Sequence, residues 1–244
     1  MQKRNYQDGG EAIVEAFRNL GVDYILSSPG SEWSPVWEAM ARQTVEKNAG
    51  PQFLDCWHET VAVDMALGYT AYTGKAQAVL IHAGVGLMHG SMAMLSATQN
   101  EIPMLVMSGE ATTFGDDPTQ PVEPQFYGGV SVGGAHRMVD PIVKWATQVT
   151  SAPTLYNTVT RSMELAQRQP QGPVYVNVSL ECMLHEWKKP SELPPIPTAP
   201  KLQPQQHDVD AIAALLKAAK LPTIVVEGAG RDPEAFKALV EQIG

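Results

Sequence analysis

The chain has few cysteines and no long apolar segment, and both shortages narrow the classes of protein to which it can belong. Cys56 and Cys182 lie far apart and form no C-x-x-C pair, which argues against a disulfide framework and a cysteine zinc site. No segment approaches the roughly 18 uncharged apolar residues of a membrane span. The polar start, residues 1–10, resembles neither a signal peptide nor a transit sequence. We therefore expect a cytoplasmic protein with no membrane partner.

Basic clusters and the common catalytic motifs are missing as well. With a net charge of -9 and no Lys/Arg run, the chain lacks the basic surface that nucleic-acid binding requires. It has no G-x-S-x-G elbow and no P-loop, which argues against hydrolases and kinases. Its six histidines never stand at the i, i+4 spacing of H-E-x-x-H. We expect no metal site made from this chain alone.

Helix and strand patterns alternate through the first 180 residues. Apolar residues at helical spacing predict helices at about 10–20, from Ser34 through Val36 and Met40, and at 59–73, 87–98 and 153–169. In the second of these, Ser34 is the expected N-cap and Pro35 the first helical residue. Continuous apolar runs predict buried strands at 23–27, 52–56, 76–82, 103–108 and 173–178. Apolar strands alternating with helices indicate a doubly wound parallel α/β sheet with helices on both faces.

A proline-rich segment divides the chain. Six prolines between residues 181 and 207 predict a semi-extended linker after a first domain of residues 1–180. Beyond the linker the pattern predicts a helix, a strand, a turn and a helix, at 209–219, 223–227, 228–230 and 233–243. A single parallel strand needs neighbours on its edges. Residues 208–244 therefore predict an incomplete second α/β domain, completed by a continuation of the chain or by a separate chain.

The ends of the predicted strands are the places where a ligand is expected, because open parallel sheets bind ligands beyond the carboxyl ends of their strands. These places are Ser28-Pro29-Gly30, Trp57-His58-Glu59, His82 to Gly86, and Gly109-Glu110 with the long loop that follows. The loop, rich in Gly, Pro and Asp up to residue 134, is long enough to indicate a functional role.

Several residues at these places allow two interpretations. Glu59 stands in the first turn of a helix, where an acid gains about 0.3–1 kcal/mol from the helix dipole without any catalytic role. His82 and His89 flank the turn Gly84-Val85-Gly86, so each can serve a ligand or the structure. That turn, lacking a third glycine, is weak evidence for a dinucleotide site. Trp33 and Trp37 favour packing over ligand stacking.

Taken together, these segments resemble the N-terminal part of the thiamine-diphosphate-dependent acetolactate synthase and benzoylformate decarboxylase superfamily. The resemblance covers Gly9 to about Val178. It rests first on Trp57-His58-Glu59 with Ala62, followed by Gly68-Tyr69, Ala71 and Thr73-Gly74-Lys75, which is similar to an H-E-x-x-A block ending in G-Y-A-x-x-T-G-K. Further blocks are Gly21-Val22-Asp23 with Ser28-Pro29-Gly30, Gly84-Val85-Gly86 with Gly90, and Glu101 to Val106 with Ser108-Gly109. The tail after Asp208 resembles the opening of the family's Rossmann-like central domain.

The resemblance implies a site and a chemistry. Glu59 is the implied catalytic residue: its carboxyl group contacts N1' of the cofactor's aminopyrimidine, and the proton shift lets the cofactor lose its thiazolium C2 proton. The implied cofactor-binding residues are Pro29, Gly30, Glu59, Gly84, Val85, Gly86 and His89. The implied substrate residues are Ser28, His82, Gln125 and Phe126. The substrate is a 2-oxo acid or a related carbonyl compound, and the cofactor is the electron sink for C–C cleavage or ligation.

Three departures from the family pattern qualify this assignment. Where many relatives have Gly-Pro-Gly and an Asn three residues beyond, this chain has Gly84-Val85-Gly86 and His89. Gln125-Phe126 reverses the Phe-Gln order usual in acetolactate synthases. The diphosphate-binding domain, with its Mg²⁺ ligands, is missing, so the resemblance implies a homo- or hetero-oligomer that supplies it. As in acetolactate synthases, a flavin (FAD) is one option, and it would be bound mostly by residues outside this chain. The alternative is a non-catalytic binding or regulatory module that keeps the fold.

Overall fold

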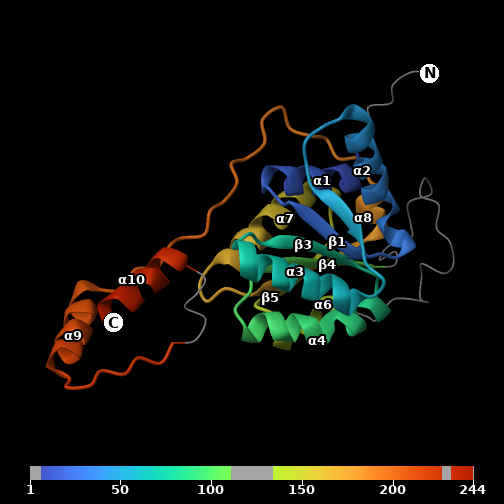
Figure 1. The fold of residues 1–244 in the computed structure, drawn as a ribbon. Coiled ribbons are helices and arrows are strands. Elements are labelled where there is room, and N and C mark those ends of the chain that lie inside the picture. Colours follow the sequence, from blue (N-terminus) through green and yellow to red (C-terminus); the bar gives the residue numbers. More distant parts are fainter. Residues whose placement is uncertain (1–6, 111–133, 227–231, 244) are drawn as a thin grey trace. The chain divides into compact units, whose positions relative to one another are not determined.

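The computed structural model describes residues 7–110, 134–226 and 232–243 (Figure 1). The chain forms two compact units, Met1–Ala199 and Pro200–Gly244, which we describe separately. Among the described residues, no helix has both the length and the apolar character that a bilayer span requires.

The first unit is built on a sheet of six parallel strands in the order β2-β1-β3-β4-β6-β5. The strands are β1 (Tyr24–Ser28), β2 (Gln52–Asp55), β3 (Gln77–Ile81), β4 (Met104–Glu110), β5 (Trp145–Val149) and β6 (Pro173–Ser179). β3, β4 and β6 are buried along their whole length, as expected for the centre of a sheet covered on both faces. The predicted doubly wound α/β class is confirmed.

Helices cover both faces of this sheet (Figure 1). One face carries α1 (Gly9–Asn19), α2 (Ser34–Glu46), α7 (Ala152–Gln167) and the short α8 (Leu180–Leu184). The other carries α3 (Glu59–Thr73), α4 (Val85–Gln99) and the short α6 (Ala135–Val139). Each group buries its own apolar cluster against the strands, so the sheet is the middle layer between two cores. Short 3₁₀ turns, η1 (Ser31–Trp33) and η2 (Asp140–Ile142), complete the unit.

The helix boundaries agree with the predicted ones to different degrees. α3 spans the predicted residues, and Gly74 ends it at φ 73°, in the left-handed region that favours glycine. α4 begins at Val85, two residues before the predicted start, and so includes Gly86. The predicted cap of α2 is wrong: Ser34 is its first helical residue and Trp33 is the N-cap. The 3₁₀ turn η1 runs directly into α2, which places the cap one residue earlier.

Five elements of the first unit were not predicted: β5, the short helices α6 and α8, and the 3₁₀ turns η1 and η2. β5 is an edge strand with a single neighbour, β6, and most of its residues are only partly buried, so its sequence has no continuous apolar run. α8 occupies the start of the expected linker, because Leu180, Cys182 and Met183 are buried. The following residues also belong to the first unit: Trp187 is 3% exposed and its N–H donates to the Gln7 carbonyl at 2.8 Å. The prediction of an extended linker from residue 181 is therefore wrong for residues 181–184, which belong to α8.

The second unit contains α9 (Gln206–Ala218) and α10 (Pro233–Ile243), at the positions predicted for its two helices. Residues 223–226 of the expected strand form no strand, and the rest of it, with the turn at 228–230, lies outside the described residues. α9 has no buried residue, and its Leu215 is 72% exposed. A strand needs a hydrogen-bonded neighbour, and the described part of this unit provides none.

Candidate active site

The candidate site lies where the strand order reverses. After β1 the chain continues to β2 on one side, and after β3 it continues to β4 on the other side. The carboxyl ends of β1 and β3 therefore form the switch point of the sheet. The last residues of the two strands, Ser28 and Ile81, stand side by side, and Ile81 is in turn level with Ser108 of β4. The segments predicted from sequence therefore begin at one edge of the sheet, at the crevice where ligands of open α/β sheets bind.

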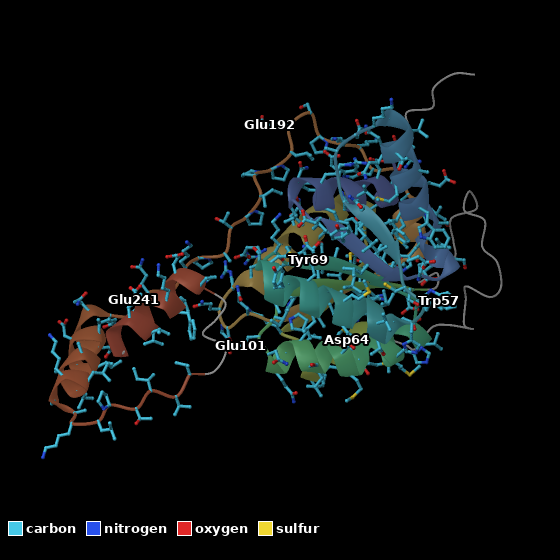
Figure 2. All side chains as sticks on the ribbon, in the orientation of Figure 1. Trp57, Asp64, Tyr69, Glu101, Glu192 and Glu241 are labelled. Carbon is cyan, nitrogen blue, oxygen red and sulfur yellow. The ribbon has the colours of Figure 1, made fainter. Side chains whose placement is uncertain are left out.

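Glu59 is the first residue of α3, just beyond β2. His58 is the N-cap, and its Nδ1 accepts a hydrogen bond from the Thr60 N–H at 3.2 Å. Glu59 is only 8% exposed although it stands at a helix end, whereas Trp57 is fully exposed (Figure 2). The helix dipole favours a negative charge at this end. The fold thus holds a carboxylate at the crevice with little contact to solvent.

A second helix contacts this carboxylate through His89 of α4. Its Nδ1 lies 3.1 Å from Oε2 of Glu59, and its ring stacks on that of His58 with centroids 4.8 Å apart. A helix-end acid stabilised by the dipole alone needs no such partner from another helix. The contact engages Oε2, while Oε1 lies on the side of Gly86.

Glycines keep the backbone bare beside Glu59. A Cβ on Gly86 would stand 2.9 Å from Glu59 Oε1 and 2.8 Å from His82 Cβ, closer than real Cβ atoms approach other groups. Gly84, the N-cap of α4, has φ 49° and ψ -78°, a conformation that side chains rarely adopt. Glu59 and His82 can therefore pack directly against the backbone of this turn.

This crowding gives a stability prediction that is independent of function. Gly86→Ala should lower the free energy of unfolding by about 1–3 kcal/mol, because the new methyl group overpacks the site. Gly68→Ala in α3 is the matched control: nothing lies within 4 Å of its Cβ, and Ala in a helix interior gains about 0.5–1 kcal/mol over Gly. Urea unfolding followed by tryptophan fluorescence measures both. Equal effects of the two variants would contradict the geometry.

His82 follows β3 and pairs with an acid that the sequence interpretation missed. Its Nδ1 lies 2.9 Å from Glu32 Oε1, and the Ala83 N–H donates to the same oxygen at 2.7 Å. The hydrogen bond to Glu32 raises the pKa of His82; burial opposes this, and the charges of Glu32 and Glu59 add to it. The sequence signal that could have identified Glu32 is its position, two residues after the Pro29-Gly30 turn at the switch point.

The remaining predicted residues are placed as follows. The Ser28 carbonyl accepts a hydrogen bond from the His82 N–H at 3.1 Å, which joins the ends of β1 and β3. Pro29 is partly buried next to the buried Gly30, and Val85 is 46% exposed at the start of α4. Gln125 and Phe126 lie outside the described residues.

The tryptophans and cysteines have structural surroundings. Trp33 is fully buried and donates from Nε1 to the Ile81 carbonyl at 2.8 Å, whereas Trp37 is 37% exposed. Cys56 and Cys182 are free and buried, and burial raises the pKa of both thiols.

Three possible metal donors lie together at the site. Within the described ranges, ligand atoms of His58, Glu59 and His89 all lie within 4.8 Å of one another. The two rings are stacked with only 27° between their planes, and nitrogen lone pairs lie in the ring plane. The rings must therefore turn before both can meet one ion, and the expectation that this chain holds no metal stays a prediction.

The fold and the site define a class of protein: a doubly wound α/β domain with a shielded carboxylate, bare glycine backbone and a histidine at its switch point. Residues 7–125 match the family model described as thiamine pyrophosphate enzyme, N-terminal TPP binding domain. Together with the acetolactate synthase relatives, this match supports a thiamine pyrophosphate enzyme of the acetolactate synthase and benzoylformate decarboxylase superfamily, and the resemblance seen in the sequence is confirmed.

Individual relatives agree with this match. The chain is 26% identical over 239 residues to the acetolactate synthase large subunit of Haemophilus influenzae, covering 96% of this chain and 39% of that protein. It is 26% identical to the sulfoacetaldehyde acetyltransferase of Rhodobacter capsulatus, covering 90% and 34%. The fold is similar to a thiamine diphosphate-dependent 4-hydroxybenzoylformate decarboxylase of Rhodococcus jostii, with a TM-score of 0.76, 21% identity, and coverage of 96% and 41%. The chain thus spans about two fifths of the length of these relatives.

Proposed function

We propose that this chain is the pyrimidine-binding half of a thiamine-diphosphate-dependent enzyme that cleaves or forms C–C bonds next to a carbonyl group. The observation that carries the proposal is Glu59, a carboxylate held at the switch point by His89 on one side and bordered by Gly86 on the other. The family match and the acetolactate synthase and decarboxylase relatives support it. A 2-oxo acid or a related carbonyl compound is the proposed substrate.

The residues present fit the cofactor. Thiamine diphosphate supplies the electron sink for C–C chemistry when it is bound. Gly86 lets the Glu59 carboxylate and His82 pack against bare backbone, and a side chain at this position would displace them. Gly84, Val85 and the Pro29-Gly30 turn supply the neighbouring backbone.

Glu59 would hold and exchange the proton at N1' of the aminopyrimidine. A positioned carboxyl group works best in this role when it is shielded from water, and Glu59 is 8% exposed. His89 orients the carboxylate through Oε2. On the substrate side we propose Ser28 and His82, together with Gln125 and Phe126 from the segment outside the described residues.

The outer faces of α3 and α4 support an assembly. Both helices are apolar around their circumference, a pattern typical of helices covered on every side. Yet several large apolar side chains of this pair are exposed: Val61, Met65, Tyr72, Val85, Met88 and Met92, with Tyr72 at 93% and Met92 at 70%. A surface of this kind marks a protein contact. We propose that a partner chain, or a second copy with a continuation beyond residue 244, covers it and brings the diphosphate-binding domain with the Mg²⁺ ligands.

Two further parts of the proposal rest on the relatives and on composition. FAD, by resemblance to acetolactate synthases, would be bound mostly by residues outside this chain. The cytoplasm is the proposed compartment, supported by the two free, buried thiols.

A binding experiment tests the two-part site. The partner-free chain should bind thiamine diphosphate at least about 100-fold more weakly than the chain assembled with its diphosphate-binding half, since lost charge-assisted phosphate and metal contacts cost several kcal/mol. Isothermal titration calorimetry with Mg²⁺, before and after assembly, measures the difference. Tight, Mg²⁺-dependent binding by the partner-free chain would contradict the proposal.

A further inference from the structure

Glu32 is a buried acid to which the proposed function assigns no role. It belongs to the 3₁₀ turn η1 after β1 and is 2% exposed. An acid is almost never buried to this extent without partners. Its partners are the Ala83 N–H at 2.7 Å and His82 Nδ1 at 2.9 Å, both on Oε1.

The surroundings of Glu32 are shaped to receive it. A Cβ on Gly109 would stand 2.0 Å from Glu32 Cγ, and a Cβ on Gly30 would stand 2.1 Å from Glu32 Oε2 and 2.0 Å from His82 Nδ1. The backbone of Gly109 is fixed in place, because its carbonyl accepts a hydrogen bond from Asn177 Nδ2 at 3.1 Å. The Glu32 side chain thus packs closely against the backbone of Gly30 and of Gly109, and these contacts restrict its conformation.

The chemistry of the pair determines where His82 carries its proton. The Ala83 N–H lies 2.9 Å from His82 Nδ1 but closer, at 2.7 Å, to Glu32 Oε1, which can accept it. A carboxylate accepts hydrogen bonds and has none to donate, so the contact with Glu32 favours a hydrogen on Nδ1 of His82. In the neutral ring Nε2 then holds the lone pair, and in the cation it carries the second proton. Nε2 is therefore the ring atom that takes up and releases a proton.

We propose that Glu32 is a positioning residue that fixes the ring and the Nδ1–H tautomer of His82, so that Nε2 is the proton-exchanging atom at the crevice that Glu59 also faces. This inference rests on the proposed function for its consequence in turnover, but the tautomer itself does not depend on a cofactor. The charged groups that act on His82 are Glu32 from η1 and Glu59 from α3, and His89 of α4 contacts Glu59 in turn. The raised pKa of His82 agrees with this arrangement.

Long-range ¹H–¹⁵N NMR spectra of the purified chain test the tautomer directly, with His82→Asn to assign the signal. Neutral His82 should be the Nδ1–H tautomer, and its titration midpoint should lie above the usual histidine value. In Glu32→Gln the midpoint should move to lower pH because the negative charge is lost. Glu38→Gln, an exposed acid on α2, is the matched control and should leave the midpoint unchanged.

The wild-type spectrum shows the tautomer of His82 even if Glu32→Gln fails to fold. An Nε2–H tautomer in the wild-type chain would overturn the proposal, as would an unchanged midpoint in a folded Glu32→Gln chain. Gly109→Ala is a second variant, because its methyl group would displace the Glu32 side chain and should lower the midpoint as well.

Turnover of the assembled enzyme supplies the functional readout. Glu32→Gln should reduce kcat by roughly 10- to 100-fold, part of what a proton-transfer group contributes, and shift the pH profile in the direction of the His82 midpoint. Glu32→Asp should recover part of the loss. An unchanged pH profile would contradict a role of Glu32 in turnover, whereas the NMR result on the tautomer would still stand. A failure of the proposed function is therefore distinguishable from a failure of this inference.

Discussion

Glu59→Gln should abolish turnover of the assembled enzyme while leaving the fold intact. The amide keeps the size of the side chain but cannot hold or release the proton that the carboxyl group exchanges. A positioned proton-transfer group contributes about 10²–10⁴-fold to rate, so a loss of at least this size is expected. Steady-state kinetics measure the loss, and circular dichroism checks the fold.

The control for this variant is Asp64→Asn, which removes an exposed acid from the same helix (Figure 2). It should leave turnover within about twofold, because no hydrogen bond or ion pair joins Asp64 to Glu59 or to the other described residues of the candidate site. Full activity in Glu59→Gln would contradict the proposed role. The same result would favour the alternative of a non-catalytic module, in which nothing requires a shielded acid held by His89.

Trp33→Ala should produce the largest loss of stability among single substitutions considered for this fold. Trp33 is fully buried, and its Nε1 donates to the carbonyl of Ile81 at the end of β3 at 2.8 Å. Removing a buried Trp side chain costs about 3–5 kcal/mol, and here it also leaves a buried carbonyl without its donor. Urea unfolding should show this loss in the free energy of unfolding.

Trp37→Ala is the matched control on the following turn of α2. Trp37 is 37% exposed, so its removal should lower the free energy of unfolding by less than removal of the fully buried Trp33. Equal losses for the two variants would contradict the placement of Trp33 as the anchor of the loop that carries Glu32. A loosened loop should also weaken the contact between Glu32 and His82.

The sequence predicted the features that local chemistry determines. The helix from Glu59 to Thr73 was found with both ends because Gly74 supplies the left-handed conformation that ends it. The central strands carry continuous apolar runs because both faces of the sheet are covered. Since parallel strands end at one edge, the positions of Glu59, His82 and the glycine turn followed from the strand pattern alone.

The sequence could not predict features that depend on partners distant in the chain. The burial of Glu32 depends on His82 and on the missing side chain of Gly109, which lie 50 and 77 positions away. The contact between His89 and Glu59 requires α3 and α4 to pack side by side. β5 has polar residues because it is an edge strand, and α8 stands in a segment whose later prolines suggested a linker.

The most direct test of the central claim is the exchange of the thiazolium C2 hydrogen of thiamine diphosphate for deuterium in the assembled holoenzyme. Rapid-quench NMR measures this rate in the wild-type protein and in Glu59→Gln, without any substrate. The account predicts exchange at least about 10²-fold slower in Glu59→Gln, since the positioned carboxyl group is the proton relay. Equal exchange rates in the two proteins would contradict it.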